Sequence, residues 1–251
     1  MKSNEMRRRS EGKAGAWIYG ACLLAAILMA SCGSDRSDSQ TQNDGQVSNG
    51  ARESDSTRLM SAVRSDDIDE VRRVFAEIGK DINDIYDDGE RSPLAFAVIK
   101  ENVEIVEFLL SEGADPNGSS ESLPIISAAF KGSIVLVKLL LEHGADPNIA
   151  QKHGVMALGM TDSTAVAKLL LDAGADIDAQ ANDGQTALHN AVYLLSLPMV
   201  SLLVSEGANI EAVDNAGETA LDYAVRITAG DEDEVEAQES IIDLLNEGES
   251  Q

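Results

Sequence analysis

Basic residues, aromatic residues and cysteines are all scarce in this sequence. The 251 residues include 19 Lys and Arg against 44 Asp and Glu, which gives a formal net charge of -25. A nucleic-acid partner needs a basic surface, so this balance argues against binding of DNA or RNA. Aromatic residues make up 4% of the chain and there are two cysteines, which excludes an aromatic-rich barrel and a disulfide-stabilised scaffold. Hydrophobic residues, at 43%, are sufficient for a globular core.

The charge is unevenly distributed along the chain. Residues 1–31 have five basic and two acidic residues, a net charge of +3, which leaves -28 for the remainder. An apolar run follows the basic stretch from Ala14 to Ala30, and small residues precede Cys32. A basic stretch, an apolar stretch and small residues before a break are typical of a secretory signal.

The string Leu28-Met29-Ala30-Ser31-Cys32 resembles the lipobox of bacterial lipoproteins, although Met29 stands where that family usually has leucine. The resemblance implies a signal peptide at residues 1–31, lipidation of Cys32 and a protein held in the cell envelope by its N-terminal lipid. Gly33 after the cysteine favours the outer membrane under the family's sorting rule, with the chain facing the periplasm. The alternative is an uncleaved membrane anchor, because an apolar run of 17 residues is at the lower limit for a spanning helix.

Residues 32–56 form a predicted tether. From Gly33 to Ser56 the only aliphatic side chain larger than alanine is Val47, and Ser, Asp, Gln, Asn and Gly predominate. Such a segment has too little apolar surface to order itself, so we expect a flexible spacer between the lipid and a folded domain.

A short string beginning with Gly-Ala recurs at intervals of 31, 30 and 33 residues, each time after an apolar stretch with helical spacing. An internal period of this length is typical of repeat architectures. The copies are Gly113-Ala114-Asp115-Pro116-Asn117, Gly144-Ala145-Asp146-Pro147-Asn148, Gly174-Ala175-Asp176-Ile177-Asp178 and Gly207-Ala208-Asn209-Ile210-Glu211, with a degenerate copy at Gly79-Lys80-Asp81-Ile82-Asn83.

A second motif is in register with the first. Ser92-Pro93-Leu94-Ala95-Phe96-Ala97, Thr186-Ala187-Leu188-His189-Asn190-Ala191 and Thr219-Ala220-Leu221-Asp222-Tyr223-Ala224 resemble the opening of the ankyrin repeat. The resemblance covers about residues 57–248 and implies an all-α solenoid of about six helix-turn-helix repeats with short β-hairpin tips, in a domain at residues 57–251. Stacking is needed because one repeat cannot bury its apolar face alone.

The repeats depart from their common pattern at specific places. Glycine is usual in the turn between paired helices and Gly132 keeps it, but Asp66, Glu101 and Leu195 occupy the matching positions. The fourth repeat is three residues short, so we expect a trimmed first helix or turn. Residues 231–236 are almost entirely acidic, and we expect a solubilising loop there rather than a calcium site, because the alternating ligands of a calcium loop are absent.

The sequence offers little for catalysis, metal binding or cofactors. His143, His153 and His189 each have a structural place in the repeat, and no pair of them has metal-ligand spacing. A mature chain has no cysteine beyond Cys32, and there is no nucleophile elbow or phosphate-binding loop. We therefore expect a non-enzymatic protein without a cofactor.

The resemblance places partner binding at the hairpin tips and along the concave groove formed by the first helices. Aligning the repeats puts several basic and aromatic residues in one groove-facing column, and such residues are common at binding hot spots. The alternative is that Lys and Arg at helix ends simply complement the helix dipole. The predicted column residues are Arg64, Lys100, Phe130, Lys131, Tyr193 and Arg226, and the predicted tip residues include Asn182 and Asp183.

These observations predict a monomeric, envelope-tethered module that binds a protein partner with apolar and acidic features, as an immunity or inhibitor protein or as a scaffold. An acidic solenoid would also suit a basic target. Two other classes remain open: a ligand-binding or enzymatic protein that uses the groove, and a purely structural spacer. A defined pocket with convergent titratable side chains would favour the former.

Overall fold

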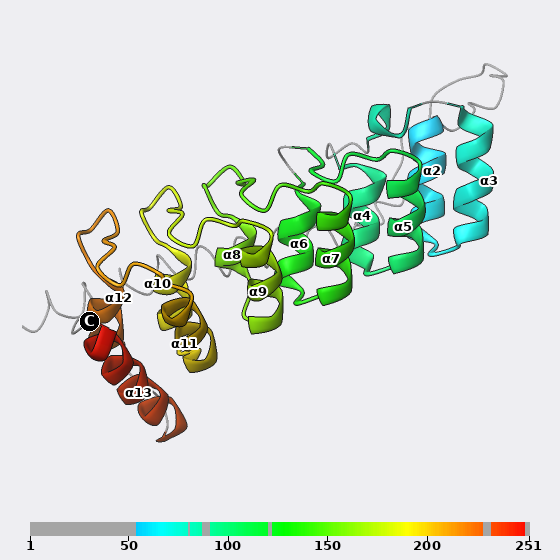
Figure 1. Cartoon of the computed structure of the whole chain (residues 1–251). Coiled ribbons are helices and arrows are strands. Elements are labelled where there is room, and N and C mark those ends of the chain that lie inside the picture. The colour runs from blue at the N-terminus through cyan, green and yellow to red at the C-terminus, as the bar shows by residue number, and fades with distance from the viewer. Residues whose placement is uncertain (1–53, 80, 87–90, 120–121, 228–231, 249–251) are drawn as a thin grey trace, which may run out of the picture. The chain divides into compact units, whose positions relative to one another are not determined.

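Figure 1 shows the computed structural model of the chain, which describes residues 54–79, 81–86, 91–119, 122–227 and 232–248. Contacts within the chain separate Met1–Arg52 from a compact unit at Glu53–Gln251. The predicted export segment, the lipobox with Cys32 and most of the predicted tether lie outside the described residues.

The described residues of the compact unit form helices and connecting turns, without a β-strand. The helices are α2 (Asp55–Arg64), α3 (Ile68–Ile78), the 3-10 turn η1 (Ile82–Asp84), α4 (Pro93–Lys100), α5 (Val103–Ser111), α6 (Pro124–Phe130), α7 (Ile134–Glu142), α8 (Ala157–Met160), α9 (Thr164–Asp172), α10 (Ala187–Tyr193), α11 (Leu197–Ser205), α12 (Ala220–Arg226) and α13 (Glu232–Gly248).

The α-helices pair along the chain into six repeats, which confirms the predicted all-α solenoid. Each even-numbered helix packs against the odd-numbered helix that follows it. The even-numbered helices also contact one another in sequence order, and so do the odd-numbered helices, so that the stack has two layers (Figure 1). One continuous apolar core runs between the layers from Leu59 to Leu245. Small side chains such as Ala97 and Ala128 are fully buried in the first layer, where they allow neighbouring helices to approach closely.

Polar side chains and proline fix the ends of the first-layer helices. Ser92 accepts a hydrogen bond from the backbone N–H of Ala95, and Pro93 takes the first helical position, where no backbone donor is lost. In the turns between paired helices, Asp66, Glu101 and Leu195 have φ angles of 62°, 60° and 53°, in the left-handed region. They therefore adopt the conformation for which Gly132 is better suited.

The fourth repeat has lost most of its first helix. Helix α8 has four residues, whereas α10, in the next repeat, has seven. Thr161 follows α8 in an extended conformation, in place of the left-handed turn of the first, second, third and fifth repeats. Only Ala157 and Leu158 of α8 are buried. The predicted trimming is confirmed, and it falls on the helix and its turn together.

The prediction of an acidic loop at residues 231–236 is wrong from Glu232 onward, because these residues form the first turns of α13. Carboxylates at a helix N-terminus interact favourably with the unpaired backbone N–H groups and the helix dipole there, and glutamate has a high helix propensity. The acidic run therefore starts the last helix.

The tips connecting successive repeats are tight turns. Two of them reach an isolated antiparallel bridge, between Ser119 and Ser122 and between Val213 and Thr219. In the described residues, the expected β-hairpins are therefore tight turns without β-strands. Neighbouring tips hold one another: the backbone N–H of Asn215 donates to the Asp183 carbonyl at 2.9 Å.

Candidate interaction surface

The predicted column lies at the C-terminal ends of the first-layer helices. Arg64, Phe130, Tyr193 and Arg226 are the last residues of α2, α6, α10 and α12, while Lys100 ends α4 and Lys131 caps α6. The fourth repeat contributes no equivalent residue, because α8 ends early. The column therefore has a gap between Phe130 and Tyr193, both of which are half-buried.

Three cationic groups converge on the ring of Phe96 in the first two repeats. The guanidinium of Arg64 lies 5.3 Å from the ring centroid, the ammonium of Lys100 lies 5.8 Å from it, and the guanidinium of Arg91 lies 5.9 Å from it. Phe96 itself is buried, with 5% of its surface exposed. Each cation–π contact of this kind contributes roughly 0.5–1 kcal/mol at an exposed site. All three cationic groups therefore contact the same aromatic ring, which holds them close to one another.

Sequence reasoning identified Arg64 and Lys100 but missed Phe96 and Arg91. Phe96 and Lys100 are four residues apart on α4, a spacing that places both on one helix face, so their proximity could have been found. Arg91 precedes the N-cap of α4 and reaches the ring from the opposite end of that helix.

Lys131 forms an ion pair with Glu101, which links the turn after α6 to the turn after α4. Its Nζ lies 2.7 Å from Oε1 of Glu101, which is the residue in the left-handed turn after α4. A pair of this kind is worth about 0.2–1 kcal/mol when it is exposed to solvent. The charge of Lys131 is thus balanced locally by the carboxylate of Glu101.

The C-terminal end of the column is occupied by internal contacts. Arg226 donates to Oε1 of Glu218 at 2.6 Å, and its guanidinium lies 5.0 Å from the ring centroid of Tyr223. Arg226 is therefore bound within its own repeat and is not brought near Arg64 or Lys100.

Tyr223 belongs to a polar network that fixes the last repeat. Its hydroxyl donates to Oδ2 of Asp214 at 2.7 Å and accepts from Nε2 of Gln185 at 3.0 Å. Burial, followed by the hydrogen bond to Asp214, raises the pKa of Tyr223. Partial burial works to raise the pKa of Asp214, but hydrogen bonds from the Glu218 N–H, the Tyr223 hydroxyl and the Ala216 N–H together lower it below its usual value.

His189 joins this network as a structural residue. Nε2 of His189 lies 3.1 Å from the Glu218 carbonyl, and Nδ1 lies 2.9 Å from the Thr186 hydroxyl. The side chain is 1% exposed and forms part of the capping box that starts α10. Both ring nitrogens therefore have partners, Thr186 in the same repeat and Glu218 in the following one.

The tip residues Asn182 and Asp183 hold neighbouring tips together. The backbone N–H of Asn182 donates to the His153 carbonyl at 2.9 Å, and its side-chain amide donates to the Lys152 carbonyl at 3.2 Å. Oδ1 of Asp183 accepts the backbone N–H of Gln185 at 3.1 Å. These contacts give both residues a structural role, whether or not they also meet a partner.

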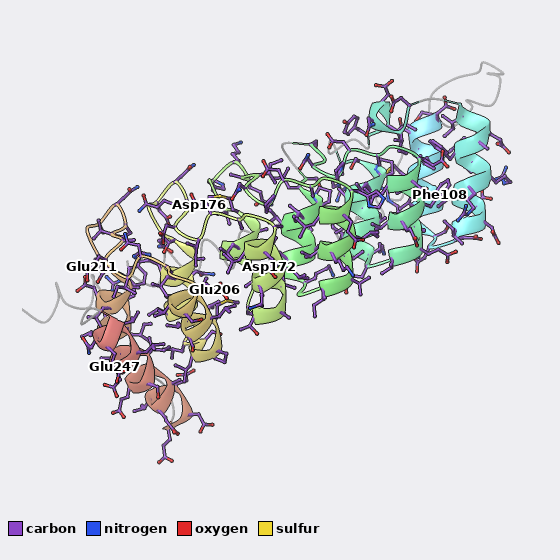
Figure 2. All side chains as sticks on the ribbon, viewed as in Figure 1. Phe108, Asp172, Asp176, Glu206, Glu211 and Glu247 are labelled. Atoms are coloured by element: carbon purple, nitrogen blue, oxygen red, sulfur yellow. The ribbon has the colours of Figure 1, made fainter. Side chains whose placement is uncertain are left out.

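Charge divides the repeats into two unlike halves. Residues 54–100 contain seven Lys and Arg against 11 Asp and Glu, a net charge of -4, whereas residues 169–251 contain a single Lys or Arg, Arg226, against 18 Asp and Glu, a net charge of -17. Acidic side chains labelled in Figure 2 extend from the helices and turns of this second half; they are Asp172, Asp176, Glu206, Glu211 and Glu247. The cations around Phe96 therefore sit at the less acidic end of the stack.

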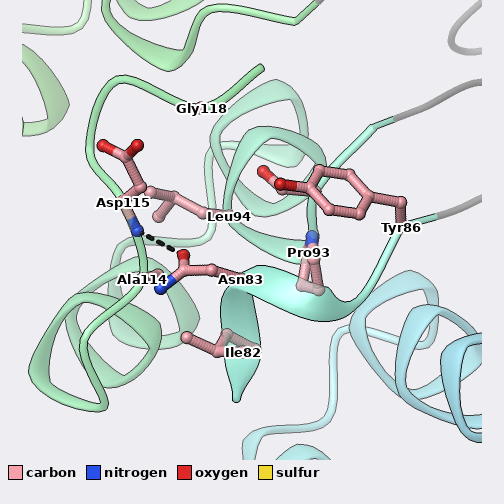
Figure 3. A pocket seen from close by; sticks show the side chains of 9 residues that line it. Ile82, Asn83, Tyr86, Pro93, Leu94, Ala114, Asp115 and Gly118 are labelled. Atoms are coloured by element: carbon pink, nitrogen blue, oxygen red, sulfur yellow. Dashed lines mark hydrogen bonds between the residues drawn. The ribbon is translucent and has the colours of Figure 1, made fainter.

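A small depression lies between η1 and the start of α4 (Figure 3). Its lining includes Ile82, Tyr86, Leu94 and Asp115, and the backbone N–H of Asp115 donates to Oδ1 of Asn83 at 2.7 Å across one side. The lining does not bring acid, base and nucleophile together. Among the described residues, no group of three or more His, Cys, Asp or Glu is arranged to hold a metal ion.

The described helices are all too short or too polar to cross a membrane. They build a two-layer stack of helix pairs with linked turns, which defines a helical-repeat protein of the solenoid class. The family model for ankyrin repeats (3 copies) matches residues 24–120, 59–151 and 153–237, and the chain therefore belongs to the ankyrin-repeat family.

Solved structures agree with this family. The ankyrin repeat domain of Bcl-3, described as a unique member of the IkappaB protein family, is 28% identical with a TM-score of 0.65, covering 76% of this chain and 86% of that chain. EF0377, an ankyrin repeat protein, is 29% identical with a TM-score of 0.65, covering 75% and 96%. An ankyrin repeat domain from Acinetobacter baumannii AYE is 25% identical with a TM-score of 0.65, covering 76% and 97%. No curated protein matches the sequence.

Ankyrin repeats are protein–protein interaction modules and are generally non-enzymatic, which assigns the described domain to the binding class.

Proposed function

We propose that this protein is exported, is held at the cell envelope by a lipid on Cys32, and binds a protein partner along the first-layer column of its repeats. The export segment, the lipobox-like string and the polar tether support the envelope location. Two or more acyl chains give stable anchoring, and a polar tether that begins at Gly33 and ends before α2 would let the repeats reach partners away from the bilayer.

The group of cations around Phe96 is the observation that carries the choice of binding surface. A chain with a strong excess of acid holds Arg64 and Lys100 against one ring, in the column that the family uses for partners. A groove of this kind suits a partner with apolar and acidic features. Binding there would let the protein inhibit an envelope toxin or hydrolase, or hold an envelope enzyme in place as a scaffold.

Site-specific photo-crosslinking in the native host tests the binding surface. A photoreactive residue at Ser61 or Ser127 lies on the first-layer helices α2 and α6, whereas one at Lys138 or Lys168 lies on the second-layer helices α7 and α9. We expect one cross-linked protein from the first-layer positions, lost on charge reversal with Lys100→Glu and Lys131→Glu. Cross-linking that survives this reversal, or that arises equally from the second layer, would exclude the column.

The envelope location has its own test. The wild-type chain should incorporate labelled fatty acid and sediment with membranes, while Cys32→Ser should lose the label. Label that persists in the variant would overturn lipidation at Cys32, and an unlabelled but membrane-bound wild type would favour the uncleaved anchor.

A further inference from the structure

Helix α12 is the last first-layer helix of the described residues, and it has an apolar face that is open to solvent (Figure 1). Val225 is 65% exposed, the highest value for a large hydrophobic side chain in the part of the chain that the structure describes. Leu221 lies one turn earlier on the same helix face and is half-buried. The end of the stack therefore leaves apolar surface uncovered.

The earlier first-layer helices bury the equivalent positions, as the alignment of the repeats that places Arg64 beside Arg226 shows. The position of Val225 is occupied, at 0% exposure, by Val63, Val98, Ala129 and Val192. The position of Leu221 is occupied, at no more than 1% exposure, by Leu59, Leu94, Ile125 and Leu188. Only the short helix α8 ends before it reaches the position of Val225. Each of these helices is followed by another first-layer helix, and this is what distinguishes them from α12.

A helix of the next repeat covers this face inside the stack. His189 on α10 is at the position of Asp222 on α12, and its ring packs edge-to-face against Tyr223 with the ring centroids 5.4 Å apart. Nε2 of His189 also lies 3.1 Å from the carbonyl of Glu218, just before α12. The face in question is therefore the one that receives the following helix, and an occupant that fits it on α12 is itself an α-helix.

The charge at this end of the stack selects the chemistry of the occupant. Helices α12 and α13 together contain eight Asp and Glu against a single basic residue, Arg226, a net charge of -7. Asp222 is exposed and is a surface neighbour of Val225, three residues later on the same helix. A second copy of this chain would bring two acidic ends together, which like-charge repulsion opposes, whereas a basic helix is attracted.

We propose that the end face of α12, formed by Leu221, Asp222 and Val225, is a docking site for a basic amphipathic helix of a partner protein. The apolar side of that helix covers Leu221 and Val225, as the next first-layer helix does inside the stack, and its Lys and Arg lie toward the carboxylates of α12 and α13. A terminal repeat normally has a polar outer face, which keeps a solenoid soluble, so apolar residues here indicate a face that is covered in use. This site depends neither on the lipid anchor nor on binding along the first-layer column.

Titration of the full chain, in micelles of an uncharged detergent, with defined peptides tests the proposal. The probe is a fluorescein-labelled peptide of about 15 residues with alanine and leucine on one helical face and lysine on the other. One control peptide has the same composition in scrambled order, and a second has glutamate in place of lysine. After subtraction of binding to empty micelles, we expect saturable binding of the amphipathic basic peptide alone by fluorescence anisotropy. This binding should weaken as NaCl rises from about 0.05 M to about 0.3 M.

Matched single substitutions localise the site. Val225→Asn removes the apolar contact without a change in charge, and it should weaken binding about fivefold or more because a valine side chain is no longer buried in the complex. The matched control Val135→Asn makes the same change on the second-layer helix α7, at a valine that is 56% exposed, and should stay within about twofold. Circular dichroism melts check that both variants remain folded, as expected for substitutions at exposed positions.

Three results would overturn this docking site. Equal weakening by the two substitutions would mean that the peptide does not bind at the end of α12. Equal binding of the scrambled peptide would reduce the interaction to attraction between net charges. A dimer in sedimentation experiments that is lost in Val225→Asn would identify a second copy of the chain as the occupant. Because neither the peptides nor the variants involve Cys32 or the cations around Phe96, failure here leaves the proposed function standing.

Discussion

Oδ1 of Asp178 accepts the backbone N–H of Asn209 at 2.8 Å, which links the fourth repeat to the fifth. Three earlier repeats make the same link with an asparagine side chain, and Asn83 and Asn148 also donate their amide to the carbonyl of Gly113 or Gly174 at 2.9 Å. An ionised carboxylate cannot donate. The link at Asp178 therefore lacks the second hydrogen bond that Asn83 and Asn148 make.

Asp178→Asn should strengthen that link. The new amide can donate to the carbonyl of Gly207, and we expect unfolding to require about 0.5–1.5 kcal/mol more free energy. Chemical denaturation of Asp178→Asn beside Asp172→Asn, which removes the same charge from an exposed position at the end of α9, checks this expectation. Equal stabilisation by both changes would attribute the effect to net charge instead.

Glu101→Gly should stabilise the protein relative to Glu101→Ala. Both changes remove the ion pair with Lys131, but only glycine adopts the φ of 60° without strain. The left-handed conformation costs an L-residue roughly 1–2 kcal/mol, so the two variants should differ by about 1 kcal/mol in urea melts. The reciprocal change, Gly132→Ala at a φ of 66°, should lower stability by a similar amount. Indistinguishable glycine and alanine variants at residue 101 would contradict this explanation.

Gly184→Ala should be more damaging than Gly144→Ala, although both glycines have left-handed φ angles of 84° and 90°. A Cβ atom at Gly184 would lie 2.6 Å from the backbone nitrogen of Asn215, whereas one at Gly144 would meet nothing within 4 Å. Gly144→Ala should cost roughly 1–2 kcal/mol from backbone strain, and Gly184→Ala at least about 1 kcal/mol more. Thermal melts that rank the two variants equally would show that the tips can separate without cost.

Tyr223→Phe should destabilise the last repeat more at neutral pH than in acid. Asp214 has a lowered pKa in the folded state, so its stabilising effect is complete above the ordinary carboxyl pKa and is lost as the pH falls through the lowered value. Removing the hydroxyl deletes one hydrogen bond to the carboxylate, worth about 1 kcal/mol when Asp214 is ionised. The difference between wild type and variant in urea melts at pH 7 should shrink below about pH 4. A difference that does not change with pH would remove Asp214 from the explanation.

Local signals in the sequence were enough to predict the stack of helices but not the arrangement of side chains on the candidate interaction surface. Capping residues, the apolar period and the matching positions of Gly132 and Leu195 predict where helices end, because each depends on a few neighbouring residues. The cluster at Phe96 depends on long side chains from three segments, and its geometry emerges only when α2 and α4 are packed. The acidic run of residues 231–236 was misjudged because composition alone does not distinguish a solvated loop from the start of a helix.

Alignment of the repeats also predicted the contacts of the column residues incompletely. Register alone aligned Arg64 with Arg226, but Arg226 pairs with Glu218 inside its own repeat. Alignment predicts which positions are equivalent, but the contacts within each repeat decide how the side chain at such a position is held.

The short helix α8 has a consequence for cooperativity. In an array where each repeat contacts only its neighbours, stability is the sum of repeat and interface terms, so the repeat with the least buried surface is where the array separates most readily. Helix α8 buries two residues, whereas α6 buries five and α10 four. We therefore expect two folding blocks, one on each side of repeat four, that unfold at different denaturant concentrations. A partner in contact with both blocks would couple them and make the array unfold as one unit.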